Sequence, residues 1–150
     1  MTPAQAAALI QDRFGVQASG EEHSLLVELS RERWAECAAF AKERLGCLYF
    51  AFLTAVDWKE EGVEVVCRVE NLEEKFSVTM KTRLGPGETH CPSLTSVYRG
   101  AEWMERECYD LFGVRFDGHP DLRRILLPQD WEGHPLLKSY DVDTPHAPYR

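Results

Sequence analysis

Three acidic residues that could do acid–base chemistry lie close together in this chain, at Glu105, Glu107 and Asp110. Paired carboxylates act as general acid and general base when their side chains converge. Helix neighbours point apart, so only Glu107 and Asp110 are spaced to meet. The stretch could be a solvated helix face paired with Arg106, a polar contact at a subunit boundary, or a catalytic dyad. The spacing favours the first of these.

Two histidines could bind a metal, because His119 and His134 each stand in a Gly-His-Pro triplet. Nearby carboxylates could complete a mixed nitrogen and oxygen site. These are Asp117, Asp121, Asp130 and Glu132. No HExxH spacing and no cysteine pair supports a metal. We therefore expect glycine and proline to shape two turns, with each histidine making a hydrogen bond there.

The thiols and glycines match no cofactor motif. The five cysteines are Cys37, Cys47, Cys67, Cys91 and Cys108, an odd number with no CxxC among them. This usage is typical of reduced, structural thiols in a cytosolic protein. No GxGxxG, GxxxxGK[ST] or GxSxG is present. The sequence therefore predicts that this chain holds no metal or redox cofactor and no nucleophilic serine.

Arg123 and Arg124 stand directly before an apolar run, Ile125 to Leu127. An arginine can bind a partner's carboxylate through two parallel hydrogen bonds, while the aliphatic residues supply buried area. The pair is thus a candidate anchor on another protein. The alternative is a surface pair held by acidic residues nearby in this chain.

The composition limits which partners the chain can have. It has 150 residues, 44% of them hydrophobic and 28% charged, with a net charge of −8. That is one soluble domain by length and balance, and its charge argues against nucleic acid. The longest apolar run, residues 48–56, is far shorter than the roughly 20 residues of a membrane span. The N-terminus lacks the basic region of a signal peptide.

Helical and period-two patterns predict an α+β fold, an antiparallel sheet meander with helices packed on it. Thr2, Pro3 and Gly15 bound a first helix, and Ser30 can cap a second that ends at Gly46. Alternation predicts strands, and an amphipathic stretch a third helix. The strands are 24–29, 48–58, 63–69 and 76–84, and the helix is 100–112. Strand 48–58 should be central and covered on both faces, and the meander should keep one wet face.

In the third helix, Met104, Cys108, Leu111 and Phe112 should form the inner face, and Glu102 and Arg106 should pair.

Beyond Gly113 the periodicity disappears, and residues 116–150 hold five prolines. A segment this polar and interrupted is disordered alone, yet it contains several large apolar residues that need a surface to pack on. They are Leu122, Ile125, Leu126, Leu127, Trp131, Leu136 and Leu137. We predict a domain over 1–115 and an extended docking tail over 116–150, packed on a partner or back on the domain. This organisation favours an assembly role over a stand-alone enzyme.

Residues 105–126, which span the third helix and the start of the tail, resemble a family signature, that of the 30 kDa subunit of respiratory complex I. The matching positions are Glu105-Arg106-Glu107, Asp110, Leu111-Phe112, His119, Arg123 and Ile125-Leu126. The similarity continues through residues 127–136. It then departs, because the family commonly reads Leu-Arg-Lys-Asp-Tyr-Pro where this chain has Leu136 to Asp141.

The resemblance implies a non-redox structural subunit of a proton-pumping NADH:quinone oxidoreductase, peripheral on the cytoplasmic face of the cell membrane. Its C-terminal arm would wrap the large subunit that forms the quinone cavity. FMN, iron–sulfur clusters and quinone would belong to partner subunits. The expected docking residues are Glu105, Arg106, Glu107, Asp110, His119, Arg123, Arg124 and His134. The alternatives are the equivalent subunit of a related membrane-bound nickel–iron hydrogenase and a free-standing small-molecule binding domain.

Overall fold

The first helix shows how local sequence signals set both ends of an element. The computed structural model describes residues 1–143, and in it helix α1 is Pro3–Phe14. Thr2 and Gln5 form a reciprocal capping box, and Gly15 ends the helix in the left-handed conformation. These bonds satisfy backbone groups that a helix end otherwise leaves free. The predicted helix is confirmed at both ends.

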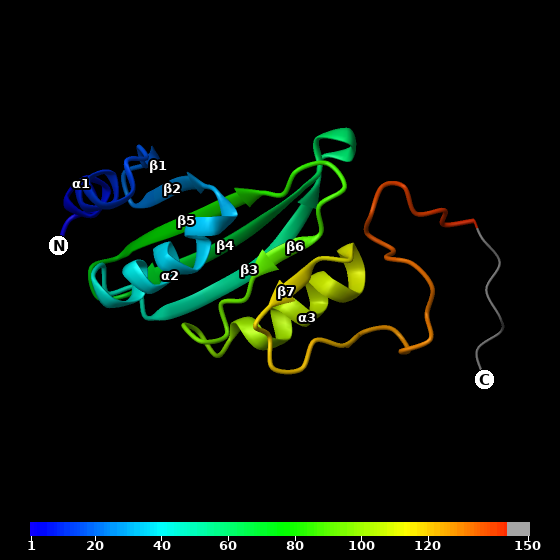
Figure 1. Cartoon of the computed structure of the whole chain (residues 1–150). Helices are drawn as coiled ribbons and strands as arrows, with labels where there is room; N and C mark the ends of the chain where they lie inside the picture. Colours follow the sequence, from blue (N-terminus) through cyan, green and yellow to red (C-terminus); the bar gives the residue numbers. More distant parts are fainter. Residues whose placement is uncertain (144–150) are drawn as a thin grey trace.

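The remaining elements alternate helices with strands. The helices are η1 (Arg31–Arg33), α2 (Trp34–Glu43), η2 (Lys59–Glu61) and α3 (Ala101–Phe112). The strands are β1 (Ser19–Glu21), β2 (Ser24–Leu29), β3 (Tyr49–Asp57), β4 (Val63–Asn71), β5 (Phe76–Arg83), β6 (His90–Pro92) and β7 (Arg115–Asp117). Figure 1 shows α3 lying beside β3, with the last part of the chain extending beyond the end of that helix.

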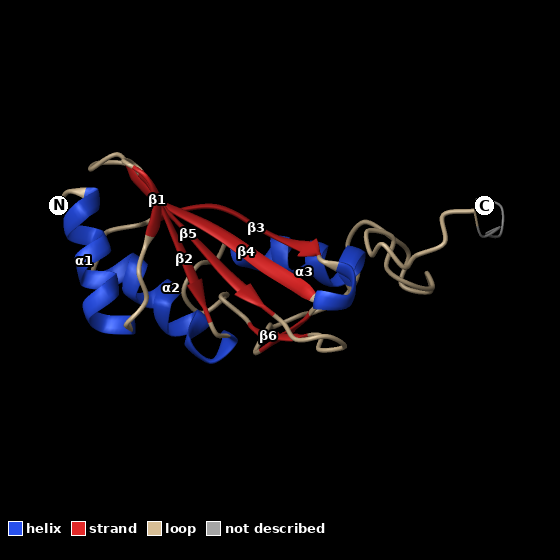
Figure 2. Cartoon of the chain, turned by 90° about the horizontal axis from the view of Figure 1, so that it is seen from above, coloured by secondary structure: helices blue, strands red, loops and turns tan. Residues whose placement is uncertain are grey.

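Five strands form the main sheet in the order β1-β2-β5-β4-β3 (Figure 2). β3, β4 and β5 pair antiparallel, which confirms the predicted meander. β2 instead pairs in parallel with β5, with Ser24 opposite Ser77. The chain between β2 and β5 passes through α2, β3 and β4. A period-two pattern within each strand therefore cannot predict that these two strands pair. The sheet is therefore mostly antiparallel, and the α+β class is confirmed.

The prediction that β3 is a central strand covered on both faces is wrong. Within residues 1–143, β3 pairs only with β4, at the edge of the sheet, and Tyr49 and Phe52 are exposed. A register irregularity between Phe50 and Phe52 interrupts the alternation. Phe50 packs instead against the ring of Tyr98, with 5.3 Å between ring centroids. The apolar run thus belongs to an edge strand that packs against α3, where Leu53 and Ala55 are buried.

The second helix begins later than its sequence predicts. Ser30 makes no capping bond with its side chain, and the single turn η1 precedes α2, which starts at Trp34. The predicted inner face is confirmed, because Trp34, Cys37 and Ala41 are buried in the core. Arg33 in η1 bonds the carbonyl oxygens at the end of α1, which ties the first helix to the second.

β6 and β7 form a small parallel sheet with Cys91 opposite Phe116, and both of these side chains are buried. This sheet crosses the domain boundary predicted near residue 115. From residue 118 to residue 143 the chain contains no helix or strand, and we call this segment the arm. It runs from orange to red in Figure 1, and residues 144–150 of the predicted tail lie outside the described residues.

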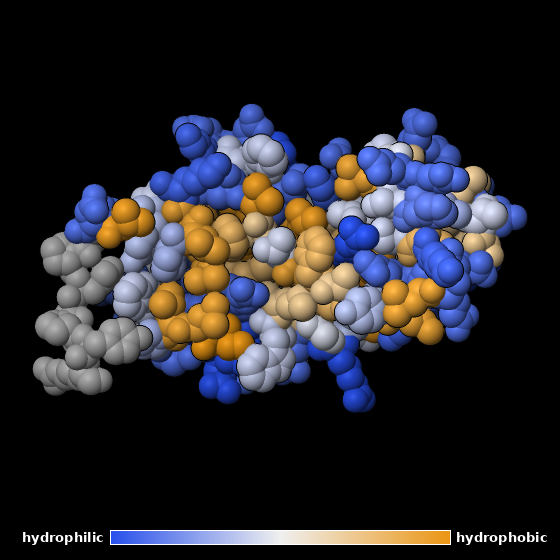
Figure 3. All heavy atoms as spheres, turned by 180° about the vertical axis from the view of Figure 1, so that it is seen from behind, coloured by the Kyte–Doolittle hydropathy of each residue, from blue (hydrophilic) through white to orange (hydrophobic). Residues whose placement is uncertain are grey.

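One face of the sheet carries alternating polar residues, as predicted. On β5, Val78, Met80 and Thr82 are buried, whereas Lys81 and Arg83 face outward. Viewed from behind, the molecule shows a polar rim around apolar atoms, which extend toward the end where the arm lies (Figure 3). Within residues 1–143 no helix is both long enough and apolar enough to span a bilayer.

Candidate partner-docking site

Glu105 points from α3 into the body of the protein and is fully buried. One carboxylate oxygen accepts the backbone N–H of Leu94 at 2.6 Å, and the other accepts the Ser93 hydroxyl at 2.7 Å. Burial raises the pKa of Glu105 from 4.5 to about 7, and these two hydrogen bonds only partly oppose that effect. Glu105 therefore fixes the loop before α3 to the helix.

Asp110 leaves the same helix on another side and organises the arm. Its side chain is fully buried. Its Oδ2 accepts three consecutive backbone N–H groups, from Ile125 at 3.2 Å, Leu126 at 2.7 Å and Leu127 at 2.9 Å. Its Oδ1 accepts from Arg124 Nη1 at 2.8 Å. One carboxylate thus holds four consecutive residues of the arm.

The guanidinium of Arg124 binds on both sides of this contact. Nη1 also donates to the Asp110 carbonyl, and Nη2 donates to the carbonyls of Trp131 and Gly133, each at 2.8 Å. Burial on its own would raise the pKa of Asp110, but the Arg124 bond and the three N–H groups outweigh it and hold that pKa below its usual value. We call Asp110, Arg124 and their bonded backbone groups the knot.

The arm also caps the C-terminal end of α3. The helix ends at Gly113, whose N–H bonds the Tyr109 carbonyl, but the next carbonyls have no partner within the helix. His134 Nδ1 donates to the Asp110 carbonyl at 3.0 Å, and the Leu136 N–H donates to the Leu111 carbonyl at 2.9 Å. Arg124 adds a cation at the negative end of the helix dipole. The end of α3 is complete only with the arm in place.

The first part of the arm is fixed farther back along α3. Arg106 donates from Nε to the Arg123 carbonyl and from Nη2 to the Arg124 carbonyl. His119 Nε2 donates to the Glu102 carbonyl at 2.9 Å, while its Nδ1 accepts the Asp121 N–H. The arm therefore lies along the helix from its first turn to its last.

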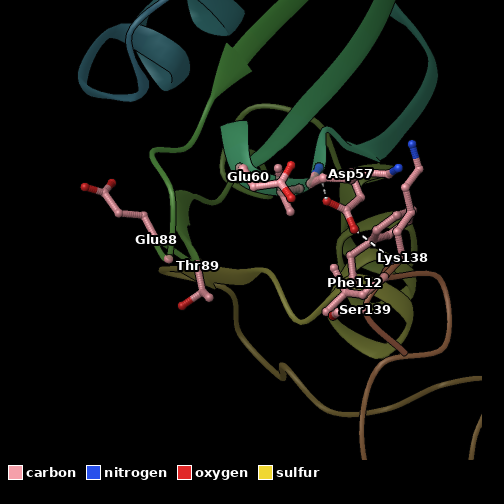
Figure 4. A pocket seen from close by; sticks show the side chains of 12 residues that line it. Asp57, Glu60, Glu88, Thr89, Phe112, Lys138 and Ser139 are labelled. Carbon is pink, nitrogen blue, oxygen red and sulfur yellow. Dashed lines mark hydrogen bonds between the residues drawn. The ribbon is translucent and has the colours of Figure 1, made fainter. Parts of the chain in front are cut away.

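A third attachment joins the arm to the end of β3. Asp57 Oδ2 accepts the Lys138 N–H at 2.8 Å, and Oδ1 accepts the Lys59 N–H. Figure 4 shows Asp57 and Lys138 on one side of a cavity of about 540 Å³, with Glu88 and Thr89 on the other. The arm thus forms one wall of this cavity.

These contacts correct the prediction of a solvated acidic face. Glu105 and Asp110 are buried, and only Glu107 faces solvent. The predicted pair of Glu102 and Arg106 is also absent within residues 1–143, because Arg106 bonds the arm instead. Cys108 is buried on the inner face as predicted, whereas Met104, Leu111 and Phe112 are half-buried.

The two arginines of the candidate anchor have different surroundings. Arg124 was expected to reach a partner's carboxylate, but its guanidinium is buried and bonded inside this chain. Arg123 is exposed and forms an ion pair with Asp121 at 2.9 Å. Docking by Arg123 and Glu107, whose side chains are accessible, stays a prediction.

The histidines and thiols have structural surroundings. His119 and His134 each make the hydrogen bond expected at their turns. Within the part of the chain that the structure describes, no three His, Cys, Asp or Glu side chains gather closely enough to hold a metal. The five cysteines are free and buried, and burial raises the pKa of Cys37 and of Cys47 to about 12. Such thiols are poor nucleophiles at neutral pH.

Sequence reasoning missed the knot and the attachment at Asp57. Asp110 and Arg124 are separated by a helix end, β7 and a loop, so no periodic pattern links them. One usable signal was the opposite charge of Asp110 and Arg124, which lie on either side of the segment that contains Gly113 and Gly118. Asp57 offered no signal, because the partners it has in the described part of the chain are backbone N–H groups, which any residue can supply.

Gly113→Ala should destabilise the protein by about 1–2 kcal/mol, because an L-residue with a φ of 75° is strained. Its Cβ would also lie 2.8 Å from Cδ2 of His134. Gly15→Ala is the matched control, with a φ of 67° and open space around the added carbon. Thermal unfolding should show the larger loss for Gly113→Ala. Equal losses would mean that His134 does not pack against this turn in solution.

Comparison with known proteins places the chain in a family. Residues 27–146 match the family model described as respiratory-chain NADH dehydrogenase, 30 Kd subunit. The NADH-quinone oxidoreductase C subunit of Chlorobium phaeobacteroides is 39% identical over 142 residues, which cover 89% of this chain and 86% of that protein. The NADH-quinone oxidoreductase C/D subunit of Phocaeicola vulgatus is 46% identical over 90 residues, but these span 59% of this chain and only 17% of that longer protein.

Two solved structures share the fold. A trypsin-resistant fragment of Nqo5 superposes with a TM-score of 0.69 at 26% identity, covering 79% of this chain and 98% of the fragment. A chain of the membrane-bound sulfane sulfur reductase, an archaeal respiratory membrane complex, has a TM-score of 0.78 over 93% of this chain and 85% of that one. At 24% identity, the second likeness concerns the fold alone. The chain belongs to the 30 kDa subunit family of the respiratory-chain NADH dehydrogenase, and the relatives compared above are named as subunits of NADH-quinone oxidoreductase.

Proposed function

We propose that this chain is a non-redox structural subunit of a proton-pumping NADH:quinone oxidoreductase, and that its arm docks the large subunit lining the quinone cavity. The observation that carries the proposal is the knot. It orders a segment without helix or strand along α3 and leaves several apolar side chains of that segment exposed. An arm of this kind is suited to contact another protein.

The fused relatives support the choice of partner. In the proteins named as C/D subunits, the counterpart of this chain and a second, D-type component form one polypeptide. Two components that are fused in some organisms are expected to be neighbours where they are separate. The separate D-type component is therefore the partner that we propose for the arm, and we call it the large partner subunit.

In this proposal the redox chemistry lies in other subunits. The buried polar side chains of α3 and the arm are engaged in fixing loops and carbonyls. FMN, iron–sulfur clusters and quinone would be held by the partners. The chain would be peripheral, on the cytoplasmic face of the membrane, and attached only through the complex.

A second candidate is the equivalent subunit of a complex I-related enzyme, such as a membrane-bound nickel–iron hydrogenase. The shared fold with the archaeal sulfane sulfur reductase complex favours keeping it, because this fold also serves a complex with another named activity. The large partner subunit separates the two candidates. Paired CxxC motifs at both of its ends would indicate nickel–iron chemistry.

The test is affinity purification of the tagged full chain from membranes in mild detergent, with the partners identified by mass spectrometry. Flavin and iron–sulfur subunits together with a large partner subunit that lacks paired CxxC motifs would support the proposal. A large partner subunit with those motifs would favour the hydrogenase-like complex. Recovery of the chain without any partner would overturn both and favour a free-standing small-molecule binding domain.

Arg123→Ala should weaken this assembly roughly tenfold while the domain stays folded, because Arg123 is an exposed cation on the arm. Arg13→Ala is a matched control. The two arginine side chains are 59% and 58% exposed, and each forms one ion pair with a carboxylate of this chain. Co-purification should fall for Arg123→Ala and stay unchanged for Arg13→Ala. An equal yield from both variants would remove Arg123 from the interface.

A further inference from the structure

Ser93 connects the buried carboxylate of Glu105 to a third polar side chain, that of Thr95. The Ser93 hydroxyl donates to Glu105 Oε2 at 2.7 Å, and its oxygen lies 2.8 Å from Thr95 Oγ1. Glu105 is fully buried and Ser93 is buried, whereas Thr95 is only half-buried. The three side chains therefore form a continuous series of hydrogen bonds from the interior of the protein toward solvent.

The loop that carries both hydroxyls is fixed to the rest of the protein. The Ser93 N–H donates to the Asp117 carbonyl at the end of β7, and the Tyr98 hydroxyl donates to the Cys47 carbonyl at 2.7 Å. Between these two points, the Thr95 N–H donates to Ser93 Oγ at 3.1 Å and holds the two hydroxyls side by side. The spacing of the series is therefore set by bonds that do not involve Glu105.

The bonds of this cluster can be satisfied whether Glu105 is ionised or protonated. When it is ionised, Ser93 donates to Glu105 and accepts the N–H and the hydroxyl of Thr95. When Glu105 is protonated at Oε2, it donates to Ser93, and Ser93 donates to Thr95 instead. The Leu94 N–H donates to Oε1 in both states. The cluster can thus gain a proton without losing a hydrogen bond.

The surroundings of Glu105 place its change of charge near neutral pH. Three thiols lie close enough to interact with the carboxylate, Cys67 from β4, Cys91 from β6 and Cys108 from α3. Burial raises the pKa of each thiol, so all three are uncharged. No charged side chain within residues 1–143 bonds Glu105, and burial raises its own pKa to about 7.

We propose that Glu105 is a proton-exchange site, and that the hydroxyls of Ser93 and Thr95 are the relay through which it takes up and releases its proton. On uptake, a hydronium ion gives a proton to Thr95 Oγ1, the original Thr95 hydroxyl proton moves to Ser93 Oγ, and that of Ser93 moves to Glu105 Oε2. Each hydroxyl oxygen gains one O–H bond and loses one, and a water molecule remains in solvent. Release follows the reverse path. The inference does not rest on the proposed function, because it requires no partner.

The experiment follows the infrared carbonyl band of the protonated Glu105 carboxyl group in the full-length chain, with Glu105→Gln identifying that band. A rapid jump from alkaline to slightly acidic pH gives the rate at which the band appears. Thr95→Val should slow this rate about a hundredfold, the lower end of what a positioned proton-transfer group contributes. The midpoint of the equilibrium titration should stay nearly the same, because it is Ser93 that bonds the carboxylate. Thr95→Ser keeps the hydroxyl and should retain the wild-type rate.

Ser96→Ala is the matched control, because Ser96 is an exposed serine of the same loop, and it should exchange at the wild-type rate. A wild-type rate in Thr95→Val would overturn the relay. Absence of the Glu105 band from the wild-type chain near neutral pH would overturn the site itself. The wild-type chain alone gives a second measurement, because transfer through the relay should be slower in heavy water. Equal rates in both solvents would mean that the loop must open first, and would also overturn the relay.

Discussion

Asp110→Asn is expected to free the arm from α3. The substitution removes the negative charge and leaves the guanidinium of Arg124 buried without its counter-ion. Breaking a buried ion pair in this way costs roughly 3–5 kcal/mol, more than the contacts of a short irregular segment can supply. The arm should open locally while the sheet and the first two helices stay folded.

Limited trypsin digestion measures this opening. In the wild-type chain the Arg124 side chain is buried, so trypsin should cleave slowly after Arg124, whereas Asp110→Asn should be cut rapidly at that bond. Asp121→Asn is the control, because the ion pair between Asp121 and Arg123 is exposed and worth little. If Asp110→Asn resists trypsin as well as the wild-type chain does, the knot does not hold the arm.

A double variant separates the loss of the pair from the cost of the orphaned charge. Asp110→Asn combined with Arg124→Met removes both charges and keeps a side chain of similar length. It should be more stable than Asp110→Asn alone, because no buried cation is left without a partner. A double variant less stable than either single one would contradict this account.

Glu105→Gln is expected to stabilise the protein at alkaline pH and to remove part of its pH dependence. Glu105 is fully buried and accepts bonds from Ser93 and Leu94, and no cation is bonded to it in residues 1–143. A glutamine has nearly the same shape and carries no charge to bury. Its amide oxygen can accept the Leu94 N–H as the carboxylate does.

The direction of the effect follows from the raised pKa. The folded protein binds the proton of Glu105 more tightly than the unfolded chain, whose pKa is the usual 4.5. Below about pH 4.5 both states hold the proton and there is no penalty. Between about pH 4.5 and 7 stability falls, and above that range the whole loss, on the order of 3 kcal/mol, is present.

Chemical denaturation at pH 5 and pH 8 tests this prediction. The difference between wild type and Glu105→Gln should be small at pH 5 and should favour the variant at pH 8. Glu107→Gln on the same helix is the control, because Glu107 is exposed and its replacement should change neither value. A constant difference between Glu105→Gln and wild type across this range would mean that Glu105 stays ionised in the folded protein.

The sequence predicted the parts of the fold that depend on neighbouring residues. The ends of α1 follow from Thr2, Pro3 and Gly15, whose roles are set within one helical turn. The antiparallel strands β4 and β5 follow from alternation alone. The irregular arm could be predicted because its prolines and its lack of periodicity are properties of residues 116–150 alone.

The sequence could not predict what depends on distant contacts. The edge position of β3 depends on its pairing with β4 alone, and the parallel β2–β5 pair on a path through three intervening elements. The burial of Glu105 and Asp110 depends on Ser93, Leu94 and Arg124, which approach α3 from both sides in the sequence. An acidic residue on a helix is solvated unless such partners reach it, and spacing within the helix cannot show that they do.

The capping of α3 by the arm also sets the order in which the chain can finish folding during its synthesis. The ribosome releases α3 before residues 124–136, so the helix emerges with the last of its carbonyls still bonded to water. Residues 1–112 can assemble the main sheet and its helices first. The end of α3 and the arm are then completed together, so the segment proposed to meet the partner becomes ordered only after the sheet behind it.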